Sequence, residues 1–210
     1  MQIGHKKRNT MYTCFSVKEI ILGKTHEKLT EDLQAWIHKQ HMFFVSTAPL
    51  SADGMINCSP KGLDSFRVLD EHTVAYIDLT GSGVETISHL KENGRIVVMF
   101  CAFEGATNIL RLYGEGEVIE PHQDGFKTLA SLFPVYESTR AIIRVHVKKI
   151  IDACGYSVPL YTFNKQRDTL IKWAENKGSD GLSAYQKQKN LQSLDGLTGL
   201  ETDKVVISKP

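Results

Sequence analysis

The sequence predicts a mainly β protein: a small antiparallel β-barrel of five or six strands with helices added at both ends. Short β-rich runs recur from residue 42 to residue 153 and are separated by polar turns such as SADG at 51–54. After Gly83 the apolar residues change to helical spacing for one short stretch. With 210 residues, 41% of them hydrophobic, the chain can form one substantial core but is short for two typical domains.

The first elements follow from capping and alternation. The segment 30–40 begins with Thr30 as an N-cap, and Leu33, Trp36 and Ile37 fall on one helical face, which predicts an N-terminal helix. The β-rich run 42–48, the turn SADG and the run 55–62 are typical of a hairpin. Two further strands are expected at 66–69 and 73–78.

A short helix is expected to interrupt the strands. Val84, Ile87 and Leu90 recur at helical spacing after the turn Gly81-Ser82-Gly83, and Asn93-Gly94 supplies a C-terminal stop. Strands resume at 95–103 and 108–120, where Gly114 and Gly116 predict a bend or bulge.

The last third of the chain adds one long strand and two helices. A helix is expected near 123–133, followed by a strand in which Ile142, Arg144, His146 and Lys148 alternate with Ile143, Val145 and Val147, which predicts one wet face. The segment 166–188 is helical in pattern, with a break at Gly178 to Gly181.

Charge and cysteine content exclude several classes of protein. With 25 Lys and Arg against 24 Asp and Glu, no net attraction to nucleic acid or to an anionic membrane is expected. Cys14, Cys58, Cys101 and Cys154 form no C-x-x-C pair, which favours reduced thiols in a cytoplasmic protein, and no apolar run approaches the roughly 20 residues of a membrane span. The polar, basic first ten residues predict a flexible arm or an upstream start codon before a natural start at Met11.

Two segments have the character of an anion site. In NCSPKG (57–62) a strand ends in Ser59, a rigid proline and Lys61; the alternative is an ordinary strand exit with a solvated lysine. In TGSGVET (80–86) a glycine-rich turn leads into a helix, so that free N–H groups and the positive end of the helix dipole converge. The alternative there is simple N-capping by Ser82 or Thr80.

Arg111 is the third candidate. It lies inside the apolar strand 109–113, where a guanidinium needs a partner such as a phosphate, or a salt bridge to Glu115 or Glu117. The histidines form no H-x-x-x-H or H-E-x-x-H motif and the serines no G-x-S-x-G elbow, so neither a metal site nor a catalytic side chain is predicted.

The order of these motifs resembles a known family. FFVSTAPLSADGMINCSPKG, VAYIDLTGSGVETISHLKENG, NILRLYGEGEVIE and the tail CGYSVPLYTF with WAENKG and KQKNLQSLDGLTGL are together similar to the pyridoxamine 5'-phosphate oxidase-like, FMN-binding split-barrel proteins, over about residues 27 to 200. The resemblance implies a six-stranded antiparallel split β-barrel with N- and C-terminal helices. It divides the chain into an arm at 1–26, an FMN-binding barrel at 27–160 and a C-terminal helical extension at 161–210.

The resemblance also implies a cofactor and a partner. Two subunits form a homodimer, and FMN lies in a cleft between them. The residues expected to face the flavin are Ser59, Lys61, Thr80, Ser82, Thr86, Asn108 and Arg111. The apolar strand residues Val97, Val98, Phe100, Leu110 and Leu112 exceed what a small barrel facing water would bury, which also favours a dimer.

The C-terminal part departs from the family's name-giving enzyme. The chain ends in GYSVPLYTF followed by helices, in place of the Arg-His-rich signature that holds pyridoxal phosphate. We therefore expect an FMN-dependent oxidoreductase that acts on a different small molecule. The alternatives are a non-enzymatic flavin-binding or sensing module and a split barrel that holds haem or a deazaflavin.

Overall fold

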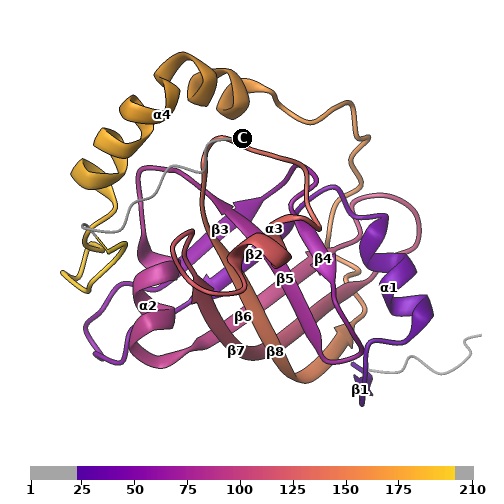
Figure 1. Cartoon of the computed structure of the whole chain (residues 1–210). Helices are drawn as coiled ribbons and strands as arrows, with labels where there is room; N and C mark the ends of the chain where they lie inside the picture. The colour runs from indigo at the N-terminus through magenta and orange to yellow at the C-terminus, as the bar shows by residue number, and fades with distance from the viewer. Residues whose placement is uncertain (1–22, 202–210) are drawn as a thin grey trace, which may run out of the picture.

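A computed structural model of the chain describes residues 23–201. These residues form one antiparallel sheet of eight strands with four helices around it (Figure 1). The strands are β1 (Thr25–His26), β2 (Phe43–Thr47), β3 (Asn57–Lys61), β4 (Phe66–Val68), β5 (Thr73–Leu79), β6 (Arg95–Cys101), β7 (Ile109–Ile119) and β8 (Thr139–Ala153). The helices are α1 (Glu31–His38), α2 (Glu85–Asn93), α3 (Phe126–Ala130) and α4 (Thr169–Lys189).

The sheet curls into a half-barrel. Its order is β3-β2-β6-β7-β8-β5-β4, and β1 pairs with the end of β8. The mainly β, split-barrel prediction is confirmed, but the expected count of six strands is too low within residues 23–201. A strand was expected at 66–69, where β4 lies, but β1 was not expected, because its two residues are too few for a visible alternation.

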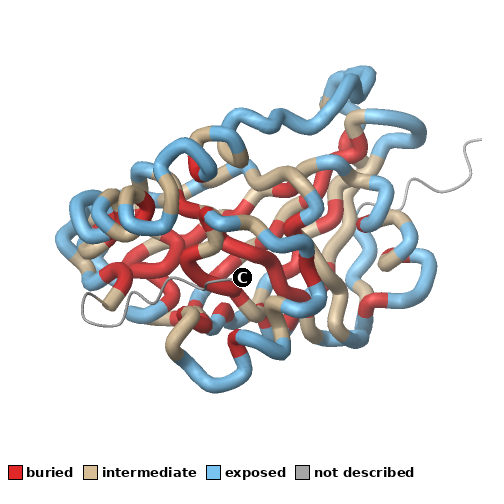
Figure 2. The backbone as a smooth tube through the Cα atoms, turned by 45° about the horizontal axis from the view of Figure 1, so that its top comes forward, coloured by how far each residue is buried: buried red, intermediate tan, exposed pale blue. Residues whose placement is uncertain are grey.

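The main core lies inside the curl, as the concentration of buried residues along the strands shows (Figure 2). Val45, Val98, Leu110, Leu112 and Ile143 are fully buried there. Four of the five residues that suggested a dimer, Val98, Phe100, Leu110 and Leu112, therefore pack inside a single chain, and that reason for a dimer was wrong.

A second, smaller core lies on the other face of β5 and β8. There α3 and the following loop place Phe126 and Phe133 over Ala75, Ile77 and Ile142. The alternation predicted for β8 is thus only half right, because Ile142 is buried under α3 while His146 and Lys148 farther along the same face are exposed.

The predicted bulge is confirmed at Gly114. The register between β7 and β8 shifts between Tyr113 and Gly114. A Cβ atom at Gly114 would collide with the carbonyl oxygen of His146, so the close approach of the two strands requires glycine.

The C-terminal segment returns over the barrel. A strap of residues 155–168 crosses from the α1 side and leads into α4, which stands over the end of the sheet near α2 (Figure 1). The predicted helix and its break are confirmed, since α4 is interrupted by a non-helical Gly178 with φ of 61°. Of the helices described, none has the length and apolarity that a membrane crossing requires.

The N-terminal arm expected at 1–26 lies mostly outside the described residues, as does the alternative start at Met11. Only Thr25 and His26 of that range have a described element, and they form β1.

Candidate functional site

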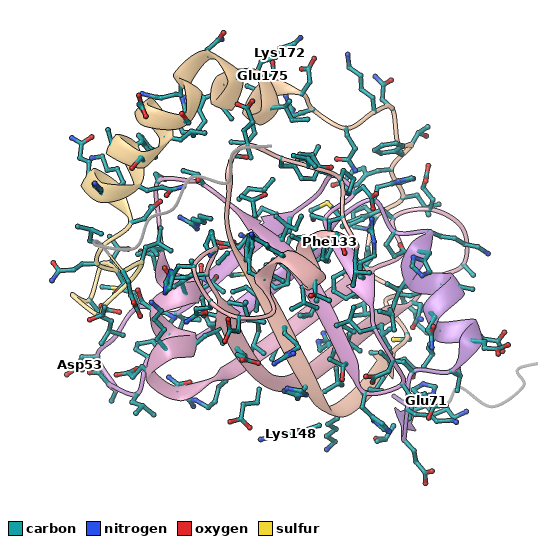
Figure 3. The ribbon with its side chains drawn as sticks, in the orientation of Figure 1. Asp53, Glu71, Phe133, Lys148, Lys172 and Glu175 are labelled. Carbon is teal, nitrogen blue, oxygen red and sulfur yellow. The ribbon has the colours of Figure 1, made fainter. Side chains whose placement is uncertain are left out.

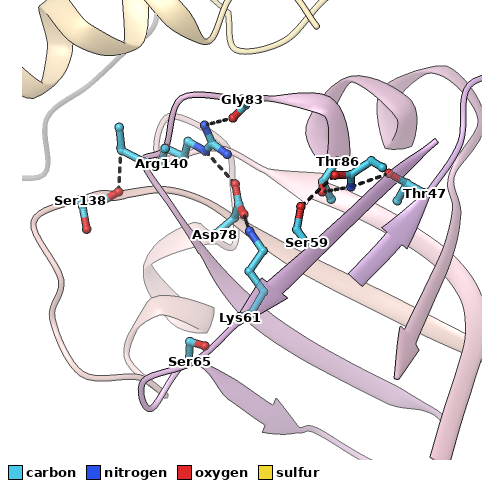
Figure 4. Close-up of polar contacts among 12 residues, drawn as sticks. Thr47, Ser59, Lys61, Ser65, Asp78, Gly83, Thr86, Ser138 and Arg140 are labelled. Carbon is cyan, nitrogen blue, oxygen red and sulfur yellow. Dashed lines mark hydrogen bonds and ion pairs between the residues drawn. The ribbon is translucent and has the colours of Figure 1, made fainter. Parts of the chain in front are cut away.

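A buried ion cluster bridges the opening between the two ends of the curled sheet (Figure 4). Asp78, on β5, is fully buried. Its carboxylate lies 2.6 Å from Nζ of Lys61, at the end of β3, and 2.7 Å from Nε of Arg140, on β8. Arg140 also donates to the carbonyl oxygen of Gly83 at 2.8 Å, which ties the cluster to the turn before α2.

The two cations control the charge of the carboxylate. Burial by itself raises the pKa of Asp78, but Arg140 and Lys61 outweigh this and lower the pKa to about 2. Asp78 is therefore ionised at neutral pH. The cluster carries one net positive charge, and the ammonium group of Lys61 is held in a fixed place with 19% of its side chain exposed.

Polar side chains of β2, β3 and α2 form a second network beside this cluster. The amide of Asn57 donates to Thr86 Oγ1 at 2.9 Å and to Thr47 Oγ1 at 3.1 Å, and Ser59 donates to Asn57 Oδ1 at 2.8 Å. Thr47 Oγ1 lies 3.0 Å from Nδ1 of His89, whose pKa is lowered by burial. Ser59 and Thr86 are thus held in one network on the core side of β3.

The glycine-rich turn is clamped from two distant segments. Thr80 is buried, and both its N–H and its hydroxyl donate to the carbonyl oxygen of Ser138, at 2.7 and 2.8 Å. Gln186 of α4 donates to Thr80 Oγ1 at 2.8 Å, and Asn190 donates to the carbonyl oxygen of Gly81 at 2.9 Å. Both amides were missed by sequence reasoning because they lie more than 100 residues from the turn.

The start of α2 has no side-chain cap. Its N-cap residue is Val84, and neither Thr80 nor Ser82 caps the helix, so the alternative of simple N-capping is wrong. Ser82 is exposed in the turn. The first N–H groups of α2 are therefore not satisfied by a capping side chain.

A cleft of about 740 Å³ lies between the barrel and the C-terminal segment. Its inner wall includes Lys61, Ile77, Leu79, Thr80 and Gly81. Its outer wall consists of residues of the strap and of α4, namely Phe163, Lys165, Gln166, Arg167, Thr169, Leu170 and Trp173. The lining contains no Asp or Glu side chain, and the volume lies within the range of about 300–1,000 Å³ that ligand pockets occupy.

The seven expected site residues do not all meet within one chain. Lys61 and Thr80 line the cleft, Ser59 and Thr86 lie in the adjoining network, and Ser82 lies in the turn. Asn108 lies in the connection from β6 to β7, where its carbonyl oxygen accepts from the N–H of Ala102.

Arg111 lies on the opposite, outer face of the sheet. Its neighbours Leu110 and Leu112 point into the core, so the side chain of Arg111 points outward, between Met99 and Ile151 on the adjacent strands. The anticipated salt bridges are not formed, because Glu115 pairs with Lys148 and Glu117 with Arg144. Among residues 23–201, the Arg111 side chain makes no hydrogen bond or ion pair.

The same outer face carries further half-buried apolar side chains. Phe44 and Met99 pair across β2 and β6 in the row that contains Arg111, and Val97 pairs with Tyr113 in the next row. Tyr113 is 36% exposed. The described part of one chain therefore presents a mostly apolar strand face in which the guanidinium of Arg111 has no partner.

No group of three or more His, Cys, Asp or Glu side chains within residues 23–201 is arranged to hold an ion. The ionic cluster and the cleft are the chemically distinctive features of this region.

Comparison with known proteins identifies the family. Residues 29–154 match the family model described as pyridoxamine 5'-phosphate oxidase. The pyridoxamine 5'-phosphate oxidase family protein ustO of Aspergillus flavus is 41% identical over 197 residues, covering 84% of this chain and 78% of that protein.

The chain is also similar to solved structures. The crystal structure of HupZ from Group A Streptococcus has a TM-score of 0.44 and 25% identity, over 58% of this chain and 90% of that chain. A putative pyridoxamine 5'-phosphate oxidase from Lactobacillus delbrueckii has a TM-score of 0.48 and 23% identity, over 60% of this chain and 98% of that chain. The family model and the fungal relative confirm the resemblance seen in the sequence: the chain belongs to the pyridoxamine 5'-phosphate oxidase family.

Proposed function

We propose that the chain binds FMN in the cleft and uses it as a flavin-dependent oxidoreductase. The observation that carries the proposal is the cleft at the barrel opening, which is lined by cations and apolar groups without any carboxylate. Phosphate binds where cations, hydroxyl groups and free N–H groups converge. Lys61 provides the cation on one wall of the cleft, and the turn beside it leads into the start of α2, which no side chain caps. Thr80 lines this wall, but its N–H and hydroxyl already donate to Ser138, so it would shape the phosphate site without donating to it.

The inner wall fits the phosphate end of FMN. The ammonium group of Lys61 is fixed by Asp78, so little side-chain entropy is lost when an anion binds to it. Ser82 lies in the adjoining turn, and Ser59 and Thr86 extend the polar wall toward α2. The domain division proposed from the sequence, with a barrel at 27–160 and an extension at 161–210, makes this wall part of the barrel.

A homodimer would explain why the outer face of the sheet carries Arg111 without a partner among apolar side chains. An unpaired guanidinium among apolar side chains is costly unless a partner supplies an anion. We propose that a second copy covers the face that carries Arg111, Met99 and Val97, and that the flavin site lies at the subunit interface. Arg111 and Asn108 would then approach an FMN molecule held mainly by the other copy.

When bound, FMN supplies hydride or electron transfer, and the protein supplies position and surroundings. Lys61 and the turn would fix the phosphate, and the apolar residues Ile77 and Leu79 would shield the flavin from water. The substrate is a small molecule. A cytoplasmic location is part of the proposal and is supported by Cys58, Cys101 and Cys154, which are free thiols.

The visible spectrum of the purified protein tests the cofactor. Flavin absorption bands are expected, and tighter binding of FMN than of riboflavin, which lacks the phosphate, would support the phosphate site. A Soret band would instead show haem. Turnover of a reduced nicotinamide cofactor by the FMN-loaded protein is expected for an oxidoreductase, and its absence with every electron donor tested would favour a non-enzymatic flavin-binding module.

Sedimentation with simultaneous detection of protein and flavin absorbance tests the dimer. Flavin should migrate only with the dimer, because a ligand that binds at the interface stabilises the assembly by mass action. A monomer-sized species that retains FMN would contradict the shared site.

A further inference from the structure

The outer wall of the cleft belongs to a part of the chain beyond the family model. The match to the family ends at residue 154, and every outer-wall residue lies at position 163 or later. The inner wall can thus serve a ligand shared by the family, while the outer wall is free to recognise a ligand specific to this chain.

The strap that forms this wall is fixed in place. Gln166 accepts a hydrogen bond from the N–H of Leu63 at 3.1 Å and donates to the carbonyl oxygen of His41 at 2.8 Å. The ring of Phe163 stacks on His41 with 3.6 Å between centroids and 14° between planes, and its N–H donates to Glu104. These contacts hold the residues on both sides of Gln166 against the barrel.

The cations of the two walls differ in whether they have a partner. Lys61, on the inner wall, is already paired with the buried carboxylate of Asp78. Lys165 and Arg167, on the outer wall, form no hydrogen bond or ion pair with any residue between 23 and 201. Within residues 23–201, the two Lys and Arg side chains of the cleft lining that have no partner are therefore both on the outer wall, across the cleft from Lys61.

The outer wall also offers flat apolar surfaces. Phe163 and Trp173 both line the cleft, and Trp173 is held edge to face against Tyr185, with 5.1 Å between centroids. Aromatic side chains favour stacking with a flat ring, and a guanidinium fork pairs well with a carboxylate.

We propose that the outer wall binds a small, flat aromatic molecule with one carboxylate group as the second ligand of the cleft. Its ring lies against Phe163 and Trp173, and its carboxylate lies between Lys165 and Arg167. The proposal rests on the proposed function in that the inner wall is left to FMN, so the aromatic acid is bound beside the flavin as its substrate.

The test uses the FMN-loaded full chain and two matched probes. Cinnamate is a flat aromatic carboxylate, and cinnamamide has nearly the same shape without the charge. Calorimetry should show cinnamate binding at least about tenfold more tightly than cinnamamide, a difference of about 1.4 kcal/mol, and cinnamate should shift the visible spectrum of the flavin. Equal affinities for the two probes would overturn the proposal.

Variants assign the preference to the outer wall. In the Lys165→Ala/Arg167→Ala double variant, the affinities for cinnamate and cinnamamide should differ by less than about twofold. The Kd for FMN should change by less than about twofold. Lys172→Ala is the matched control: this lysine is in the first turn of α4, is paired with Asp168 and points to solvent (Figure 3), so the variant should keep the preference. A double variant that keeps the preference, or that loses FMN as strongly as cinnamate, would overturn the proposal.

The two proposals fail in different ways. If no flavin binds, the proposed function is wrong. The calorimetric comparison of cinnamate with cinnamamide on the flavin-free chain then still shows whether the outer wall binds an aromatic carboxylate. If flavin binds and cinnamate shows no preference over cinnamamide, only the outer-wall assignment is wrong.

Discussion

Replacing Lys61 by alanine is the sharpest test of the phosphate site. The ammonium group lies 2.6 Å from Asp78 at the barrel opening and lines the cleft. A hydrogen bond to a charged group contributes about 1.5–3 kcal/mol, so the variant should bind FMN about 10- to 150-fold more weakly than the wild type. Riboflavin binding should change by less than about threefold, because riboflavin has no phosphate.

The same substitution has a separate cost in stability. Breaking a buried ion pair completely costs about 3–5 kcal/mol. Because Arg140 still lies 2.7 Å from Asp78, we expect a smaller loss, on the order of 1–3 kcal/mol in the free energy of unfolding. Chemical denaturation measures this loss, and flavin titration is then carried out where the variant is fully folded.

Lys148→Ala is the matched control, since Lys148 is exposed on the barrel far from the cleft and, within residues 23–201, pairs with Glu115 (Figure 3). It should leave FMN binding unchanged. Lys61 does not hold the phosphate if folded Lys61→Ala binds FMN within twofold of the wild type, or if its affinity for riboflavin falls by the same factor as its affinity for FMN.

Four further outcomes follow from the same structure. In the folded protein the pKa of Asp78 is lowered from 3.8 to about 2, so the ionised carboxylate contributes about 2 kcal/mol to the free energy of unfolding above pH 4, and this contribution is lost as pH falls toward 2. Between pH 5 and pH 2.5, chemical denaturation should show a smaller decrease in the free energy of unfolding for Asp78→Asn than for the wild type. Arg111→Ala should weaken FMN binding by about 1.5–3 kcal/mol. Arg144→Ala, which removes an exposed ion pair with Glu117, should leave FMN binding unchanged. Equal effects of the two variants in flavin titrations would show that Arg111 does not contact the flavin. Gly114→Ala should cost about 1–3 kcal/mol in thermal or chemical unfolding, because the new methyl group meets the β8 backbone; unchanged stability would show that the bulge can relax. Replacing all four cysteines by serine should leave flavin loading intact, whereas a flavin–thiol adduct at the exposed Cys58, detected by mass spectrometry, would show that this thiol takes part.

Local signals predicted the elements well. Thr30 accepts a hydrogen bond from the N–H of Leu33 as the N-cap of α1, and Gly94 ends α2 in the left-handed conformation with φ of 71°. Gly114 marks the bulge. Each of these features depends on residues within a few positions of one another, so the sequence carries the information directly.

The site was less predictable because its partners are distant in sequence. Arg111 and Arg140 both lie in apolar strands, yet only Arg140 meets a buried carboxylate. The available signal was Asp78, a single acid inside the apolar run of β5, which had to find a cation. Gln186 and Asn190 gave no such signal, since amides on a C-terminal helix are ordinarily solvated.

The clamp on the glycine-rich turn has a consequence for biosynthesis. The hydrogen bond from Gln186 to Thr80 joins residues that are 106 positions apart. At typical rates of synthesis the ribosome adds these residues in about 5–20 s, so Thr80 lacks this partner for at least that time. During that interval the strands of the barrel can pair while the outer wall of the cleft does not yet exist. A nascent chain therefore exposes the cleft side of Leu79 to water and to other chains. The chain can hold its ligands only after the last segment has been released and has packed over the barrel, which is later than the formation of the sheet.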